Sequence, residues 1–345
     1  MTAVIAMATA REYAYTRARM GVARTGGAPV NGDEPDFDDL TRRYRRELHV
    51  HCYRMLGLYD EAEDHVQEMF LRAWRSRENF QGRSSARTWL YRIATNACLD
   101  TLRRDARRAT GAPSGTDPSV AAMPWLQPYP DAELVADQPD PEATAVSRET
   151  ISLAFLAAIQ LLPPRQRAVL ILRDVLTWPA TEVAALIETT VPAVNSALQR
   201  AHATLHHRWP RGRLDWSPAA EPDPEQSRLL QRYIAAHEQA DPEALIAVLH
   251  EDVRLSISPA IGQWTGREQV ARALRAGMTT LGRWRLLPTT ANGQPAVAGY
   301  LRRPTDEAFH PFVLSVLHIE YGQLADITAF EQPSLFPAFG LPTSL

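Results

Sequence analysis

Lysine is absent from this sequence of 345 residues, so arginine supplies all 37 of its basic side chains. Cysteine is almost absent, and two residues, Cys52 and Cys98, are too few for a disulfide framework or a zinc site. We read both as small core residues in a reducing compartment. No apolar run reaches the length of a membrane span, and the N-terminus lacks the pattern of a signal peptide. We therefore expect a cytoplasmic protein that has no contact with a membrane.

Length and charge set further bounds. A chain of 345 residues can form two or three domains, each with its own core. Its formal net charge of −3 argues against a protein that binds DNA tightly by itself. Residues 1–35 mix Arg, Gly, Ala and Pro without a period and are predicted to be disordered. We expect three folded modules at 36–108, 147–209 and 225–332, a proline-rich linker at 109–146 and an apolar tail at 333–345.

The stretch from Asp64 to Arg108 carries the strongest signal. Its first helix has one apolar stripe, made of Ala62, Val66, Met69, Phe70 and Ala73. The opposite face carries Asp64, Gln67 and Glu68 with Leu71 in their midst. A solvated face has little reason to place a leucine among acids, so this face is predicted to dock a basic partner.

The next helix of the stretch changes the sign of the charge. Ten arginines lie between Arg72 and Arg108, against three acidic residues. Arg92, Asn96 and Arg103 share one line of the helix, because spacings of four and seven return to one side. Arginine pairs with phosphate, and aromatic and amide side chains meet unstacked bases. The alternative is a helical bundle with a solvated arginine face, and charge alone does not decide between the two.

Two sequence runs resolve this choice by resemblance. AEDHVQEMFLRAW and RTWLYRIATNACLDTLRR resemble region 2 of bacterial RNA polymerase sigma factors of the extracytoplasmic-function group. The resemblance implies that Asp64, Gln67 and Glu68, with Leu71 beside them, bind the coiled coil of the largest polymerase subunit. It also implies residues that melt and read the −10 promoter element, namely Trp89, Arg92, Asn96, Arg103 and Arg104.

The second module has the pattern of a helix-turn-helix. A helix ends at Pro163-Pro164, a second is predicted from Arg165 to Leu176, and a short one from Thr181 to Ile187. The last helix places Pro192 in its first turn and exposes Asn195, Ser196, Gln199 and Arg200. Many repressors have such a motif, but its position here resembles sigma region 4, which reads the −35 element. The family often has several arginines where this helix has Asn195, Ala197 and Gln199.

The linker contains MPWLQPYPD, in which a Trp and a Tyr stand among prolines. A proline-rich segment presents aromatic rings at little entropic cost, whereas a plain spacer does not need them. The alternative is a linker that packs locally on its own domain. The resemblance implies that the linker lies in polymerase channels, and the motif is similar to that of a subgroup with an extra C-terminal domain.

The third module shows helices first and strands afterwards, which predicts an α+β domain with a curved antiparallel sheet. The pattern HEQADPEALIAVLHEDV…WTGREQV resembles the SnoaL-like cone fold over residues 225–332. That cone usually encloses a pocket, which here either binds a small molecule or serves as a rigid platform. The candidate acid–base residues form no motif with a second catalytic group; they are His237, Asp252, His310, His318 and Asp326. No cofactor or metal is expected.

The sequence as a whole favours an alternative sigma factor that is not itself an enzyme. Its partners would be the polymerase core and promoter DNA, and its third module would regulate activity in cis. The apolar tail, with Phe336 and Phe339, needs burial and is expected to help dock that module on the other two. One alternative is a cone-fold isomerase or cyclase fused to a DNA-binding module. Another is a plain repressor, which leaves both helices of the first module unexplained.

Overall fold

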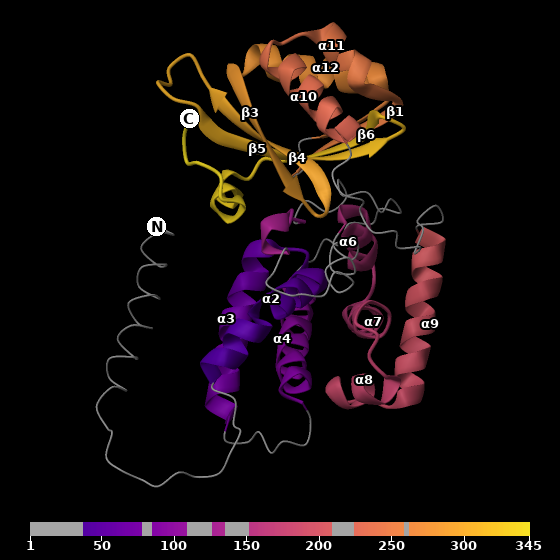
Figure 1. Cartoon of the computed structure of the whole chain (residues 1–345). Coiled ribbons are helices and arrows are strands. Elements are labelled where there is room, and N and C mark those ends of the chain that lie inside the picture. Colours follow the sequence, from indigo (N-terminus) through magenta and orange to yellow (C-terminus); the bar gives the residue numbers. More distant parts are fainter. Residues whose placement is uncertain (1–36, 78–84, 109–125, 135–151, 209–223, 259–261) are drawn as a thin grey trace, which may run out of the picture. The chain divides into compact units, whose positions relative to one another are not determined.

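The computed structural model describes residues 37–77, 85–108, 126–134, 152–208, 224–258 and 262–345 (Figure 1). Residues Leu40–Leu345 form one compact unit by their contacts. The predicted disorder of residues 1–35 and most of the predicted linker lie outside the described residues. Within the described residues, no helix is both long and apolar enough to cross a membrane.

The first module consists of α2 (Phe37–Leu56), α3 (Tyr59–Ser76) and α4 (Ala86–Arg108). The helix α2 is buried in its second half, where Leu48, Cys52 and Met55 face the core. Cys98 on α4 is also buried, and both cysteines are free thiols, as expected of core residues. Gly57 ends α2 with a φ of 79°, a conformation that a residue without a Cβ adopts at least cost.

The second module contains α6 (Leu153–Gln160), α7 (Pro164–Leu170), η4 (Ile171–Val175), α8 (Ala180–Leu186) and α9 (Val191–Arg208). Ser152 caps α6 by accepting a hydrogen bond from the amide of Phe155 at 3.3 Å. The predicted helix from Arg165 to Leu176 is in fact α7 followed by a π-helical turn, η4. The helix-turn-helix is present, with α8 as its short helix and α9 as its recognition helix.

The third module has α10 (Pro224–Glu238), α11 (Pro242–Val248) and α12 (Arg267–Thr280) beside one six-stranded sheet. The strands are β1 (Leu249–Ser258), β2 (Gly262–Thr265), β3 (Arg283–Ala291), β4 (Gln294–Arg302), β5 (His310–Glu320) and β6 (Gln323–Phe330). Their order is β2-β1-β6-β5-β4-β3. The expected antiparallel sheet is found in β3, β4, β5 and β6 and in the pairing of β1 with β2. The expectation fails at one place, where β1 pairs with β6 in parallel.

Both faces of the sheet are covered. The helices α10 and α12 pack on one face, around a core that includes Leu255, Val270 and Ile327 (Figure 1). The other face is covered by the C-terminal tail, whose η5 turn (Pro333–Phe339) buries Phe336 edge-on against Tyr300 with ring centroids 5.2 Å apart.

The apolar tail therefore has a different partner from the one expected. Phe336 packs on the domain's own sheet, and the Tyr300 hydroxyl donates to the carbonyl of Pro342 at 2.8 Å. Leu345 and Phe309 exchange two backbone hydrogen bonds, each of 2.9 Å. The tail thus completes the core of its own domain, and the expected role of Phe336 in docking on the other modules is not seen.

Candidate functional site

The face predicted for docking is exposed along α3. Asp64, Gln67, Glu68 and Leu71 are all exposed, while Val66, Met69 and Ala73 are buried behind them. Leu71 is 44% exposed, an unusual state for a leucine that has acidic neighbours. Glu68 pairs with Arg72 at 2.9 Å, and the Gln67 amide donates to Glu63 at 3.0 Å. The exposure of this face, predicted from the helical period, is therefore confirmed, and its docking role stays a prediction.

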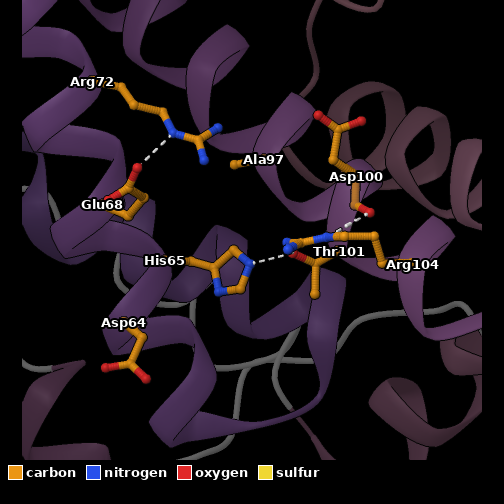
Figure 2. A pocket seen from close by; sticks show the side chains of 8 residues that line it. All are labelled: Asp64, His65, Glu68, Arg72, Ala97, Asp100, Thr101 and Arg104. Carbon is orange, nitrogen blue, oxygen red and sulfur yellow. Dashed lines mark hydrogen bonds and ion pairs between the residues drawn. The ribbon is translucent and has the colours of Figure 1, made fainter. Parts of the chain in front are cut away.

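A groove of about 580 Å³ separates this face from α4 (Figure 2). His65 lines this groove and connects α3 to α4: its Nδ1 lies 2.7 Å from the carbonyl of Glu61, and its Nε2 lies 2.9 Å from the hydroxyl of Thr101. The Arg104 guanidinium donates to the same Thr101 hydroxyl at 2.8 Å. The residues that line the groove are Asp64, His65, Glu68, Arg72, Ala97, Asp100, Thr101 and Arg104.

The residues predicted to read the −10 element differ in exposure. Arg92 and Arg103 are exposed and Asn96 is half-buried, so their line on α4 reaches solvent. Trp89 is only 7% exposed and lies in the core. Arg103 forms an ion pair with Asp100 at 2.9 Å, three residues earlier on the helix.

Three residues near α4 escaped the sequence reasoning. Arg87 forms an ion pair with Glu47 at 3.0 Å, and its guanidinium lies over the rings of Tyr91 and Trp178, 5.3 and 5.7 Å from their centroids. Trp178 belongs to the second module, just before α8, and its ring centroid lies 5.0 Å from that of Tyr91. Neither aromatic residue has a signal in the sequence that would name its partner.

The recognition helix α9 presents the predicted polar face. Asn195, Ser196, Gln199 and Arg200 are all exposed, whereas Val194, Ala201 and Leu205 are buried. The turn before it places Glu188 at a φ of 53°, a conformation that glycine adopts more readily. His202, further along α9, lies 2.6 Å from the carboxylate of Asp174 and ties the helix to η4. The face is therefore held on a fixed scaffold.

The first and second modules meet at the end of α2. Arg167 of α7 is buried, with no acidic partner among the described residues, and its guanidinium donates to the carbonyls of Met55, Ile159 and Leu162. The amide of Gln160 donates to the carbonyl of Arg54 at 3.1 Å. Burial lowers the pKa of Arg167 to about 10, which leaves it charged at neutral pH. The charge faces carbonyls at the negative end of α2.

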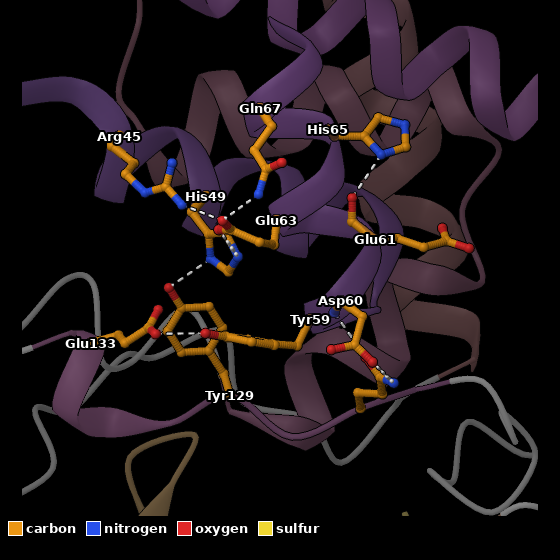
Figure 3. A network of polar contacts seen from close by, with 11 residues as sticks. Arg45, His49, Tyr59, Asp60, Glu61, Glu63, His65, Gln67, Tyr129 and Glu133 are labelled. Atoms are coloured by element: carbon orange, nitrogen blue, oxygen red, sulfur yellow. Dashed lines mark hydrogen bonds and ion pairs between the residues drawn. The ribbon is translucent and has the colours of Figure 1, made fainter. Parts of the chain in front are cut away.

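The described part of the linker, residues 126–134, packs against α2 and α3 (Figure 3). The Tyr129 hydroxyl lies 2.9 Å from Nδ1 of His49, and the hydroxyl of Tyr59 donates to Glu133 at 2.5 Å. Gln127 donates to Asp60 at 3.1 Å, and its backbone amide donates to the carbonyl of Gly57 at 2.9 Å. The linker here is a packed element of the structure.

The same linker residues contact the third module. Asn292, in the turn between β3 and β4, accepts from the amide of Tyr129 at 2.8 Å and donates to the Tyr53 hydroxyl at 3.0 Å. The next residue, Gly293, donates to Asp131 at 2.8 Å, and Gln127 donates to Gln332 at 3.0 Å. Asn292 is 1% exposed. The sequence Asn-Gly predicts a tight hairpin turn, but nothing in it predicts the partner.

The acid–base candidates of the third module do not form one site. His237 lies half-buried on α10 beside Trp284, and desolvation of its ring lowers its pKa to about 4. Asp326 pairs with Arg254 at 3.0 Å, while His318 contacts Glu320 and Gln294. Asp252 is exposed, as is His310 at the start of β5. In the described residues, no group of three or more His, Cys, Asp or Glu side chains could hold a metal ion.

Comparison with known proteins matches all three modules. Residues 40–108 match the family described as Sigma-70 region 2, residues 152–205 match Sigma-70, region 4, and residues 230–327 match the SnoaL-like domain. The three matched ranges follow one another along the chain in this order.

Individual proteins resemble the chain over most of its length. The ECF RNA polymerase sigma factor SigG of Mycobacterium tuberculosis is 43% identical over 333 residues, which cover 93% of this chain and 88% of that protein. The ECF RNA polymerase sigma factor SigW of Bacillus subtilis is 33% identical over 50% of this chain and 89% of that protein. The crystal structure of the M. tuberculosis extracytoplasmic function sigma factor SigJ shares the fold, with a TM-score of 0.58, 20% identity, and coverage of 89% of this chain and 99% of that chain.

Proposed function

Because the chain belongs to the extracytoplasmic-function sigma factors of bacterial RNA polymerase, we propose how its three modules divide the work of that family. Members bind the polymerase core and direct promoter-specific initiation. In this division, α3 binds the core, α4 and α9 read the promoter, and the SnoaL-like domain regulates the other two in cis. The chain itself catalyses no reaction and acts in the cytoplasm, where the polymerase works.

The core-binding surface is the exposed face of α3. We assign it Asp64, Gln67, Glu68 and Leu71, because these side chains reach solvent together from one rigid helix. A leucine among carboxylates suits a partner that offers basic side chains around an apolar patch. The coiled coil of the largest polymerase subunit, with such a surface, is the proposed partner.

The promoter-reading surfaces lie on α4 and α9. Arg92, Asn96 and Arg103 form the proposed −10 surface, since they share the solvent-facing line of α4. Asn195, Ser196, Gln199 and Arg200 form the proposed −35 surface, because the leading face of a recognition helix enters the major groove. Arg and Gln there can bond base edges in pairs, and Asn and Ser can reach bases or phosphates.

The regulatory role of the third module is supported by the linker contacts. Residues Gln127–Asp131 bond to α3 or α2 on one side and to Asn292, Gly293 and Gln332 of the SnoaL-like domain on the other. The domain is therefore held against the core-binding module by buried polar contacts. A change in these contacts would change how the two promoter-reading modules are placed. A small ligand of this domain stays a prediction from the sequence.

A transcription assay tests the proposed function. The full chain, added to purified core enzyme, is expected to start transcription from one or a few promoters in a panel, and the double charge reversal Asp64→Arg/Glu68→Arg is expected to abolish it. Truncating charged interface pairs costs about 2–5 kcal/mol, so co-purification of this variant with core should fail as well. A folded variant that still co-purifies with core would contradict the assignment of α3.

The enzyme alternative has a test of its own. A cone-fold isomerase or cyclase requires a base and a second polar group facing one substrate. Of the five candidates, His318 and Asp326 are cross-strand partners on β5 and β6, but Asp326 is already paired with Arg254 and His318 contacts Glu320. His237 lies half-buried on α10. The geometry therefore offers this alternative no support. Turnover of a steroid-like or polyketide-like substrate by the full chain would reverse that judgement.

A further inference from the structure

The two adjacent arginines of α4, Arg103 and Arg104, point to different surroundings. An α-helix turns by about 100° per residue, so neighbours lie on different faces. Arg103 belongs to the line of Arg92 and Asn96, whereas Arg104 lines the groove that also contains Asp64 and Glu68 (Figure 2). The sequence predicts one role for both arginines, but the structure separates them.

The Arg104 side chain is held at the wall of this groove. Its Nη2 donates to the Thr101 hydroxyl at 2.8 Å, and its Nε donates to the carbonyl of Asp100 at 3.4 Å. The Thr101 hydroxyl in turn lies 2.9 Å from Nε2 of His65, so it accepts from Arg104 and donates to the histidine. His65 belongs to α3. A residue of the docking helix thereby fixes the guanidinium before any partner arrives, which lowers the entropic cost of binding.

Two charged side chains of the groove, Asp64 and Arg104, lack an oppositely charged partner among the described residues. Among the described residues, Asp64 has no ion-pair partner, and Arg104 donates to a hydroxyl and a carbonyl but to no carboxylate. The other charged residues of the groove are already paired: Glu68 with Arg72, and Asp100 with Arg103. A partner that fits this groove therefore brings a basic side chain for Asp64 and an acidic one for Arg104.

We propose that the core-docking surface continues from α3 across the groove to α4, and that Arg104 belongs to it. The occupant is a helical segment of the polymerase core that carries a basic and an acidic side chain on one face. This inference rests on the proposed role of α3 in core binding. It moves Arg104 from the promoter-reading set to the protein-docking set and leaves Arg103 where it was.

Matched substitutions in the full chain test the proposal. Core affinity is measured by fluorescence titration with purified core enzyme, and promoter opening is measured at saturating core on a promoter found in the transcription panel. R104E is expected to weaken core affinity at least tenfold, with opening at saturation within twofold of the parent. R103E is expected to do the reverse. R104Q, which removes the charge without reversing it, is expected to lose affinity to an intermediate extent.

The possible outcomes distinguish the proposed docking role of Arg104 from the proposed core-binding role of α3, on which it rests. If R104E and R104Q bind core within twofold of the parent and impair opening, Arg104 reads the promoter and the proposal is overturned. If the Asp64→Arg/Glu68→Arg variant also binds core normally, the assignment of α3 itself fails. If the Asp64→Arg/Glu68→Arg variant loses core binding but R104E and R104Q do not, the assignment of α3 stands and only the extension of the docking surface to α4 is refuted. Circular dichroism of each variant establishes that it is folded.

Discussion

At the scale of single residues, α2 buries two neutral histidines in the first module. His51 is fully buried, with Nε2 2.9 Å from the Thr95 hydroxyl, and burial lowers its pKa to about 3. His49 is bonded to Tyr129, and burial is the largest cause that lowers its pKa to about 4. Both side chains are therefore uncharged in the folded protein at any pH near neutrality.

This burial predicts that acid destabilises the protein. The unfolded chain protonates these histidines below its ordinary histidine pKa of 6.5, whereas the folded protein does so only near pH 4 and 3. Their contribution to stability is complete above pH 6.5 and is lost as the pH falls from 6.5 through the folded pKa. The loss is about 1.4 kcal/mol per pH unit for each histidine within that window.

Chemical denaturation at pH 7 and pH 5 checks this prediction. Between these values the parent is expected to lose about 2 kcal/mol more stability than His51→Gln, because the variant lacks one buried titrating ring. His206→Gln, at an exposed position of α9, is the matched control and should lose as much as the parent. An equal loss in the parent and in His51→Gln would show that the buried ring does not titrate as argued.

The sequence predicted which residues are exposed wherever the apolar residues of a helix recur with a regular spacing of three and four. The face with Asp64, Glu68 and Leu71 was predicted from its spacing alone, and all three residues are exposed. The resemblance placed Arg104 in the promoter-reading set together with Arg103. The helical period, however, turns Arg104 by about 100° away from the line of Arg92, Asn96 and Arg103. The resemblance also placed Trp89 among the promoter-reading residues, but its side chain is buried, which favours a role in the core.

At the scale of elements, α4 and α9 are predicted to act at different steps. Arg200→Ala, on the exposed face of α9, is expected to cost about 1–3 kcal/mol in promoter binding and to relax the preference at one or two positions of the −35 element. Asn96→Ala, on α4, is expected to leave duplex binding intact and to impair formation of the open complex, since amide side chains meet unstacked bases.

Templates melted in advance around the −10 element separate these two effects. On such templates Asn96→Ala should bind less well than the parent, although it binds duplex DNA normally, because its target is the exposed bases. Arg200→Ala should show the same defect on melted and duplex templates, because its target is upstream. An identical defect of both variants on both templates would refute the division of labour between α4 and α9.

The elements themselves were mostly predictable, but their pairing was not. Helix-turn-helix, cone helices and most strands followed from apolar periods and from proline and glycine positions. The parallel pairing of β1 with β6 did not, because an alternating pattern fixes which face is buried and carries no information on the neighbouring strand. The four residues of β2 are too few to show a period at all.

At the scale of the whole molecule, buried polar contacts join modules that the sequence presents as separate. Arg167 and Gln160 bind carbonyls at the end of α2, and Asn292 binds the linker and Tyr53. Such contacts were beyond sequence reasoning, because the partners are over a hundred residues apart and each is a common polar residue. The Asn-Gly pair at 292–293 is typical of a turn. The burial of the Asn292 side chain, however, is explained only by its distant partners.

This arrangement predicts the effect of Asn292→Gly. Asn292 has a φ of 56°, so glycine preserves the turn while it removes the hydrogen bonds to the Tyr129 amide and the Tyr53 hydroxyl. The Tyr129 amide, left buried without this acceptor, should cost about 1–3 kcal/mol, whereas the Tyr53 hydroxyl still donates to the carbonyl of Gln127 at 2.6 Å. Hydrogen exchange of residues 126–134 is expected to become faster, because the third module then holds the linker by fewer hydrogen bonds, chiefly those of Gly293 to Asp131 and of Gln332 to Gln127.

The control for this variant is Tyr321→Gly, at the turn between β5 and β6. Tyr321 also has a positive φ, of 50°, but it is 95% exposed, so glycine there alters the chain entropy in the same way without removing a buried contact. If the third module regulates in cis, Asn292→Gly should change promoter-specific transcription at least threefold at equal core, and Tyr321→Gly should not. Faster exchange of the linker with unchanged transcription would mean that the contact holds the domain in place and has no part in its regulation.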